Sequence, residues 1–459
     1  MKKWIKYSLV GGGGTVGIAI VAGLVSLALY WDMIEVVSGT QEVRGATDAV
    51  PDAVPGSLPP ITDGPTDWTR WRGPRDDGRS AQTGILKDWS GGLEKLWEVK
   101  FLCRGKKAAT WSAPVVRGNR LVVPGRDDEN DLLFCLDPVT GALVWKTAYP
   151  ARKSSFLHGT GPRATPFVDG DRVYTFGRAG DLVCGKLLDG SEVWHRNVTD
   201  EGGDAPKWGH SSSPLVTETL VVVQGGGSVR VIAYDKMTGD VKWTSGEGEA
   251  GYAALTRVRM GGVDAALAFH GTGLAAVRLA DGAELWDTRW KTMSLVNATT
   301  PVVEGDLVFI TSDYGKGGSL LRFDAGSVTT VWANRAIAAH HSDPFVIDGH
   351  IYGYSGMSAQ NRGDFKCLVL ATGEEKWSTR EMGHGTCVHV DGHLLCCDIE
   401  GNLFLMKPDP EKFMKVTGMP KALGDVRGPV WTVPVIANGL LYLRFKQKLV
   451  CYRLAPTRQ

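Results

Sequence analysis

Polar side chains that could bind a ligand gather in several short stretches of the chain, between longer apolar ones. These stretches are rich in His, Ser, Thr, Asn and Asp, and they are 158–163, 210–213, 297–300, 313–314, 340–343 and 358–362. From them we predict a binding site made of Arg163, His210, Ser211, Ser212, Asn297, Asp313, Tyr314, His340 and His341. Aromatic walls for such a site could come from Trp111 and Trp431.

Metal binding and simple strand capping are the other chemistries open to these side chains. His340, His341 and Asp343 could offer imidazole and carboxylate ligands to a transition metal. They lie in one loop, however, and would need partners from distant parts of the chain, so we predict no metal site. The remaining alternative is that the His and Ser side chains only cap the ends of strands.

No sequence motif of a catalytic centre stands out, and we assign no catalytic residue. Gly225–Gly227 is not followed by a helical pattern, which a phosphate-binding loop would require. Ser211–Ser213 stands beside His210 without the glycine pattern of a nucleophile elbow.

A turn followed by a tryptophan recurs along the chain and indicates the elements that position the polar stretches. Asp137 to Gly141 precedes Trp145, and Asp235 to Gly239 precedes Trp243. Asp can start such a turn through its backbone hydrogen bonds, and Gly supplies the positive φ that closes it. We predict that the tryptophans of this repeat dock each sheet on its neighbour; they recur every 43 to 49 residues, at Trp97, Trp145, Trp194, Trp243, Trp286, Trp332 and Trp377. A final, degenerate copy has Phe413 in place of Trp.

A second element lies between the tryptophans and fixes the fold class. It consists of a Pro or small residue, an apolar pair, a tight turn and an apolar strand, as in Pro114 to Leu121 and Pro166 to Val173. Six copies with Pro and two without give eight units of four short strands. We therefore predict an all-β, eight-bladed β-propeller of four-stranded antiparallel blades. The strand around Trp97 is expected to complete the last unit, whose own fourth strand is missing.

The propeller geometry predicts where the polar stretches meet. The first strand of each blade lines the central channel, so residues just before it surround one mouth of the channel. The opposite face carries short, uniform turns such as 117–119, 169–171 and 304–306. Variable loops on a rigid scaffold are the usual place for binding, which favours the polar mouth.

The amino terminus has the pattern of a membrane anchor. Residues 1–7 carry three lysines, and 8–31 contain no charged residue, enough to cross about 30 Å of hydrocarbon. We predict a cytoplasmic tail (1–7), a transmembrane signal-anchor helix (8–31), a flexible tether (32–67) and the propeller (68–459) on the extracytoplasmic, periplasmic side. A cleaved signal peptide is the alternative.

Charge and cysteine content exclude some classes of function. The net charge of +1 gives no reason to expect a nucleic-acid partner. Most of the eight cysteines stand in apolar strand patterns, as small buried hydrophobes do. No Cys-x-x-Cys-His occurs, which excludes covalent c-type haem.

The Thr-Gly-x-x-x-Trp and Pro-x-Val-x-x-Gly elements resemble pyrroloquinoline-quinone-like propeller repeats from Trp68 to Leu454. Such repeats occur in quinoprotein alcohol dehydrogenases and in the non-catalytic outer-membrane-assembly lipoprotein. Exported propellers of planctomycete-type bacteria also look similar, with Trp71-Arg-Gly-Pro74 opening the domain. WD40 repeats fit poorly, because only Trp286-Asp287 offers the dipeptide they need.

The resemblance implies two functions. Dehydrogenases of this type add a Ca²⁺ site, a catalytic Asp and a disulfide between adjacent cysteines, which Cys396-Cys397-Asp398 superficially resembles. The surrounding residues match an ordinary strand and turn, so we expect no quinone or other cofactor. We predict a non-catalytic binding or assembly scaffold for a protein, peptide or glycan, with a pyrroloquinoline-quinone-dependent dehydrogenase as the alternative.

Overall fold

The computed structural model describes residues 43, 48–53, 58–105, 107–151, 159–356 and 363–456. The predicted tail (1–7) and signal anchor (8–31) lie outside these residues, as does most of the predicted tether. Within the described ranges, no helix combines the length and the apolar character that a membrane crossing requires.

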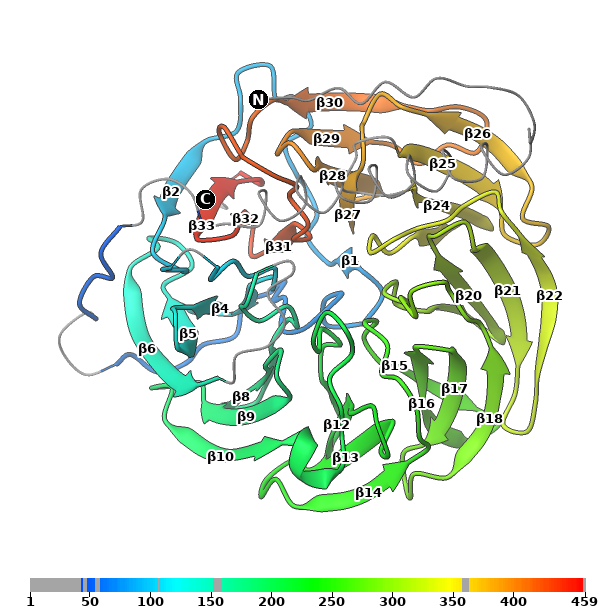
Figure 1. Cartoon of the computed structure of the whole chain (residues 1–459). Coiled ribbons are helices and arrows are strands. Elements are labelled where there is room, and N and C mark those ends of the chain that lie inside the picture. The colour runs from blue at the N-terminus through cyan, green and yellow to red at the C-terminus, as the bar shows by residue number, and fades with distance from the viewer. Residues whose placement is uncertain are drawn as a thin grey trace, which may run out of the picture.

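Eight sheets surround a central axis, which confirms the predicted eight-bladed propeller (Figure 1). The first strand of each blade lies at the channel and the fourth at the rim. Blade 1 has β3 (Val115–Arg117), β4 (Arg120–Arg126), β5 (Asn130–Leu136) and β6 (Leu143–Pro150). Blade 2 has β7 (Phe167–Asp169), β8 (Arg172–Phe176), β9 (Asp181–Lys186) and β10 (Glu192–Asn197), followed by the 3₁₀ helix η1 (Val198–Glu201). Blade 3 has β11 (Leu215–Val216), β12 (Leu220–Gln224), β13 (Val231–Asp235) and β14 (Val241–Ser245).

The remaining blades repeat this order. Blade 4 has β15 (Thr256–Met260), β16 (Val263–His270), β17 (Gly273–Arg278) and β18 (Glu284–Arg289). Blade 5 has β19 (Val302–Glu304), β20 (Leu307–Ser312), β21 (Gly317–Phe323) and β22 (Val328–Asn334). Blade 6 has β23 (Phe345–Ile347), β24 (His350–Ser355), β25 (Asp364–Val369) and β26 (Glu375–Thr379). Blade 7 has β27 (Gly385–Val390), β28 (His393–Asp398), β29 (Leu403–Met406) and β30 (Lys415–Met419).

Blade 8 joins the two ends of the propeller, as predicted from the strand around Trp97. Its inner strands are β31 (Val435–Ala437), β32 (Leu440–Phe445) and β33 (Lys448–Arg453), and its outer strand is β2 (Lys95–Val99). The strand β2 pairs antiparallel with β33, and Trp97 stands opposite Cys451. This pairing covers the outer edge of β33 with a strand from the other end of the chain.

Each repeated tryptophan contacts the next blade through both its ring and its indole N–H. Trp145 on β6 is 5% exposed and donates to the carbonyl of Leu187 in blade 2 at 3.0 Å. Gly190 lies under this ring with φ 74°, and a Cβ there would be 2.6 Å from it. The equivalent indoles of Trp97, Trp194, Trp243, Trp286, Trp332 and Trp377 likewise donate to a carbonyl of the following blade. The glycines that lie under such a ring, where a Cβ would come closer than 3.0 Å and displace it, are Gly141, Gly190, Gly239, Gly282 and Gly373.

The interface between blades 7 and 8 is built differently. The strand register places Thr417, not Phe413, at the position that the docking tryptophan occupies in the other blades, so the predicted Phe copy is wrong. Phe413 instead packs on Trp377 from the turn before β30. Trp89, from the segment preceding β2, is buried here, and its backbone N–H donates to the Thr417 hydroxyl at 3.3 Å. At this interface the buried ring therefore comes from the blade 8 side (Trp89), whereas at the other interfaces the fourth strand of the preceding blade supplies it.

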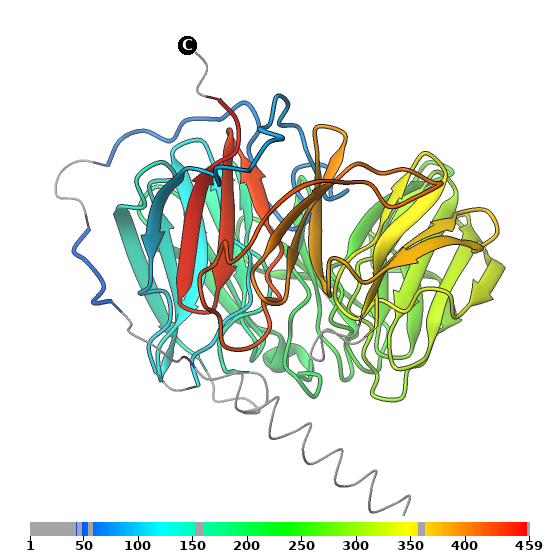
Figure 2. The same ribbon diagram turned by 90° about the horizontal axis from the view of Figure 1, so that it is seen from above.

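An N-terminal segment, residues 58–80, lies along the face of the short turns and then enters the channel (Figure 2). Residues 58–67, which we expected within the flexible tether, contact blade 1: Arg120 donates to the carbonyl of Pro59, and Asn119 to that of Pro60. The Asp67 carboxylate accepts from Gly118 N of blade 1 and from the Asn438 amide of blade 8, each at 2.8 Å. The segment therefore links blade 1 to blade 8, in addition to the strand β2 that precedes blade 1 and completes blade 8. Its short strand β1 (Arg79–Ser80) pairs parallel with β27.

Candidate functional site

An aromatic and imidazole row, defined as Tyr314, His340, His341, Trp431 and Trp111, connects blades 5, 6, 8 and 1 at the mouth of the channel. The Tyr314 ring lies 5.4 Å from that of His340, edge to face, with the hydroxyl 3.4 Å from Nε2. His340 and His341 are 5.0 Å apart, and His341 lies 5.3 Å from Trp431. Trp431 in turn lies 4.8 Å from Trp111. The structure thus brings together five residues that we named from the sequence.

His384 extends this row and was missed in the sequence analysis. It immediately precedes β27, is fully buried, and lies 6.3 Å from His341. Its ring stacks on Tyr354 at 5.3 Å, and Nε2 lies 3.0 Å from the carbonyl of Gly356. The rule used for the other residues, a polar side chain just before an innermost strand, would have found it. The degenerate start of blade 7, which lacks the Pro, hid the position.

Burial keeps His340 and His384 neutral near pH 7. Burial lowers the pKa of both His340 and His384 to about 4. It also raises the pKa of the Asp313 carboxyl and brings that of Tyr314 to about 12. A mouth lined by neutral rings favours apolar, π-rich or hydrogen-bonding ligands over simple ions.

Two arginines belong to blade 2, next to the Trp111 end of the row, where the Trp111 backbone N–H donates to the Pro162 carbonyl at 3.2 Å. Burial lowers the pKa of Arg163 well below its usual range, and the neighbouring Arg178 adds to this effect. Burial also lowers the pKa of Arg178, to about 10. The His210 backbone N–H donates to the Arg178 carbonyl at 2.9 Å, and the His210 ring packs 4.8 Å from Phe176. His210 itself is buried, which lowers its pKa to about 4.

Two other candidates, Asn297 and Ser212, lie deeper than the sequence suggested. Asn297 is fully buried; its amide donates to the carbonyls of His270 at 2.7 Å and Trp290 at 3.1 Å, and accepts from Ser312 at 2.8 Å. Its side-chain groups are used inside the protein, so we leave it out of the proposed site. Ser212 is also buried, whereas Ser211 is partly exposed.

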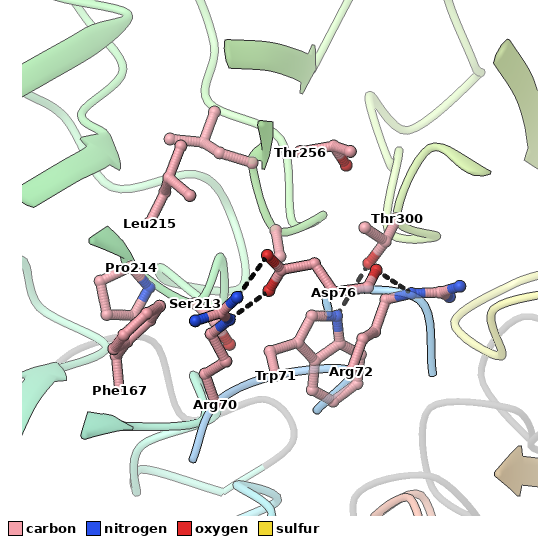
Figure 3. A pocket seen from close by; sticks show the side chains of 12 residues that line it. Arg70, Trp71, Arg72, Asp76, Phe167, Ser213, Pro214, Leu215, Thr256 and Thr300 are labelled. Carbon is pink, nitrogen blue, oxygen red and sulfur yellow. Dashed lines mark hydrogen bonds and ion pairs between the residues drawn. The ribbon is translucent and has the colours of Figure 1, made fainter. Parts of the chain in front are cut away.

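Two pockets lie between the inner strands and residues 68–78 of the N-terminal segment. The first is lined by Arg70, Trp71, Phe167, Leu255 and Thr300, among others (Figure 3). The Trp71 indole donates to Thr300 at 2.9 Å, and Arg70 pairs with Asp76 at 2.7 Å.

The second pocket links the channel with the mouth, since His341 and Cys387 line it together with Trp71. Arg72 forms an ion pair of 2.8 Å with Asp343, and the two side chains are 7% and 8% exposed. Asp343 therefore holds the N-terminal segment in the channel instead of joining His340 in a metal site.

Two features of the described residues bear on the quinone alternative. Calcium requires several carboxylate or carbonyl oxygens, and among the described residues no three His, Cys, Asp or Glu side chains are grouped closely enough to hold a metal. Cys396 and Cys397 also belong to different apolar clusters, on opposite faces of β28. They cannot face one ligand together.

The comparisons with known proteins agree with the repeat family. Residues 151–379 match the family model described as outer membrane protein assembly factor BamB. A europium-containing methanol dehydrogenase shares 12% identity over 83% of this chain and 89% of its own, with a TM-score of 0.59. The quinohemoprotein alcohol dehydrogenase ADHIIG from Pseudomonas putida HK5 shares 12% identity over 86% and 81%, with a TM-score of 0.57. The computationally designed protein Ika8 shares 13% over 79% and 100%, with a TM-score of 0.54. No curated protein sequence gave a significant match. At these identities the solved structures share the fold alone.

Proposed function

We propose that this propeller, whose residues 151–379 match a model of the pyrroloquinoline-quinone-like repeat family, is a non-catalytic binding or assembly scaffold. Its ligand binds at the channel mouth, against the aromatic and imidazole row. A protein or peptide partner is favoured over a glycan, because the matched family model is described by an assembly role.

The single observation that carries this proposal is the continuous row from Tyr314 to Trp111. Trp, Tyr and Arg are the residue types that most often dominate the energy of protein interfaces, and the mouth offers Trp111, Trp431, Tyr314 and Arg163. The neutral histidines allow close packing without the cost of burying charge. The N-terminal segment covers part of the opposite face, so the two faces are not equivalent.

We propose further that the propeller is held on the extracytoplasmic side of a membrane by residues 8–31. This proposal comes from the uncharged run and the lysines before it. Sequencing the amino terminus of the protein from cell membranes tests it. A chain beginning with residues 1–7 is expected, whereas one beginning after about residue 31 would show a cleaved signal peptide.

Photo-crosslinking in cells tests the binding face. A crosslinking amino acid at Ser211 or His341 is expected to yield a discrete protein adduct. The matched control positions are Asp171 and Asp306, in the short turns of the opposite face; Asn119 is unsuitable because Pro60 and Thr62 contact it. Adducts from the control positions alone would reverse the assignment of the face.

Affinity measurements with the captured partner then test the residues. His341→Ala is expected to weaken binding at least tenfold, as loss of a central interface residue commonly does. Asp171→Ala should leave the affinity unchanged. Equal affinities for His341→Ala and the wild type would remove the row from the site.

The dehydrogenase alternative has a direct test. We expect no change in the absorption spectrum when pyrroloquinoline quinone and Ca²⁺ are titrated into the purified protein. Saturable binding together with dye reduction by an alcohol would favour the dehydrogenase instead.

A further inference from the structure

Two cysteines of blade 7 face each other across the inner hairpin. Cys387 on β27 and Cys396 on β28 are direct Cα partners in the antiparallel ladder. The hairpin closes with a two-residue turn, Asp391 and Gly392, whose φ angles of 49° and 72° are both positive, as in a type I′ turn.

The turn fixes which kind of pair the cysteines form. Val390 and His393 flank the turn as a hydrogen-bonded pair, and the two kinds of pair alternate along the ladder from there. Cys387 and Cys396 are three steps away, so they form a non-hydrogen-bonded pair. In such a pair the Cα atoms lie about 4.5 Å apart and the side chains are closest, within the range that a disulfide spans.

The side chains already meet. The two Sγ atoms are 2.7 Å apart, and both cysteines lie in the cluster that contains Tyr354 and Phe365. Cys397, the next residue, belongs to the cluster on the opposite face of β28. Cys396 therefore has Cys387, and not its neighbour in sequence, as its partner.

We propose that Cys387 and Cys396 form a disulfide, a cross-strand bond within the inner hairpin of blade 7. The oxidant is a protein or peptide disulfide, which reacts by thiol–disulfide exchange. The Cys387 thiolate attacks one sulfur of the oxidant and displaces the other as a thiolate. The Cys396 thiolate then attacks Sγ of Cys387 and releases the second. The oxidant gains two electrons, and its two sulfurs take up the two protons lost by the cysteines.

Position decides which cysteine reacts first and when. Cys387 is 8% exposed and lines the channel pocket next to Trp71 and His341, whereas Cys396 is fully buried. In the folded protein an incoming disulfide can therefore reach only Cys387. Burial raises the pKa of this thiol well above its usual range, so its thiolate is scarce in the folded protein. The bond consequently forms most readily during folding, before the channel closes over the hairpin.

Refolding the full-length protein with oxidised glutathione, followed by thiol alkylation and peptide mapping, tests the proposal without relying on its cellular location. We expect two fewer alkylated cysteines than after reduction. Cleavage by trypsin and at Asp residues should yield 381–390 linked to 391–397, because Asp391 separates Cys387 from Cys396. Full alkylation of all eight cysteines, or a bond between Cys396 and Cys397, would overturn the proposal.

Two variants identify the partner. Cys396→Ala should abolish the linked peptide, whereas Cys397→Ala, a buried neighbour on the other face, should retain it. The opposite pattern would show that Cys387 pairs with Cys397. If either variant fails to fold, fragmentation of the linked wild-type peptide between Cys396 and Cys397 identifies the partner, because both cysteines lie in 391–397.

Discussion

Replacing Trp145 should reveal how strongly one blade holds the next. Trp145→Ala removes a ring that is almost fully buried between blades 1 and 2 and leaves the Leu187 carbonyl without its indole donor. Truncation of a large core aromatic costs about 3–5 kcal/mol. Trp145→Phe keeps one ring but loses part of the packing and the hydrogen bond, so an intermediate cost of about 1–2 kcal/mol is expected. Trp243→Ala should cost less than Trp145→Ala, because Trp243 is only partly buried.

Urea unfolding followed by circular dichroism measures these differences. Tryptophan fluorescence should give the same midpoint, which checks that the transition is two-state. The slope with urea should not change, so that a shift in midpoint reports stability. A loss below about 1 kcal/mol for Trp145→Ala would refute the claim that the ring docks the blades. Trp145→Ala combined with Trp332→Ala, at a distant interface, should be additive within about 0.5 kcal/mol.

Three further predictions concern the N-terminal segment, the histidines and the closure of the ring. Arg72→Met leaves the buried Asp343 without its ion partner and should lower the free energy of urea unfolding by about 3–5 kcal/mol. Adding Asp343→Asn should restore much of this loss. Equal stability of the single and double variants would contradict the reasoning. Stability should fall as pH drops from about 6.5 to 4, because unfolded His takes up a proton there while native His340, with a pKa of about 4, does not. That fall should be shallower in His340→Gln, and an identical slope would show that His340 does not contribute. Deleting residues 93–100 removes β2 and should cause aggregation detectable by light scattering; a soluble product that melts like the wild type would argue against closure by this strand.

The repeat made the fold predictable from sequence. A turn and a tryptophan at regular spacing define a small sheet that cannot bury both of its faces alone. Eight such sheets bury their faces by packing side by side around a ring. The closure by Trp97 followed from counting strands, because the last unit lacked one and the first had one to spare. The meeting of Tyr314, His340 and His341 followed from their common position before or between inner strands.

Features outside the repeat could not be predicted in this way. Residues 58–67 have no strand pattern, and what fixes them is tertiary: the Asp67 carboxylate finds donors on both the first and the last blade. Asn297 stands in a polar stretch just as His341 does. Its amide, however, hydrogen-bonds inside the protein with the carbonyls of His270 and Trp290 and with the Ser312 hydroxyl. At the last repeat, Phe413 has the aromatic character of the docking residue, yet the register gives that position to Thr417.

The pairing of β2 with β33 also sets the order in which the molecule can be completed. β2 is synthesised first among the blade strands, and its partner is nearly the last part of the propeller to be made. Blades 1 to 7 can each form from local hairpins as the chain emerges, whereas blade 8 must wait for the final strand. Among the described residues, the pairing of β2 with β33 is the strand pairing of greatest sequence separation, and it carries a large loop-closure cost. We therefore expect ring closure to be the slow, final step of folding, and a chain that terminates before β33 to accumulate as a nearly complete propeller that never closes.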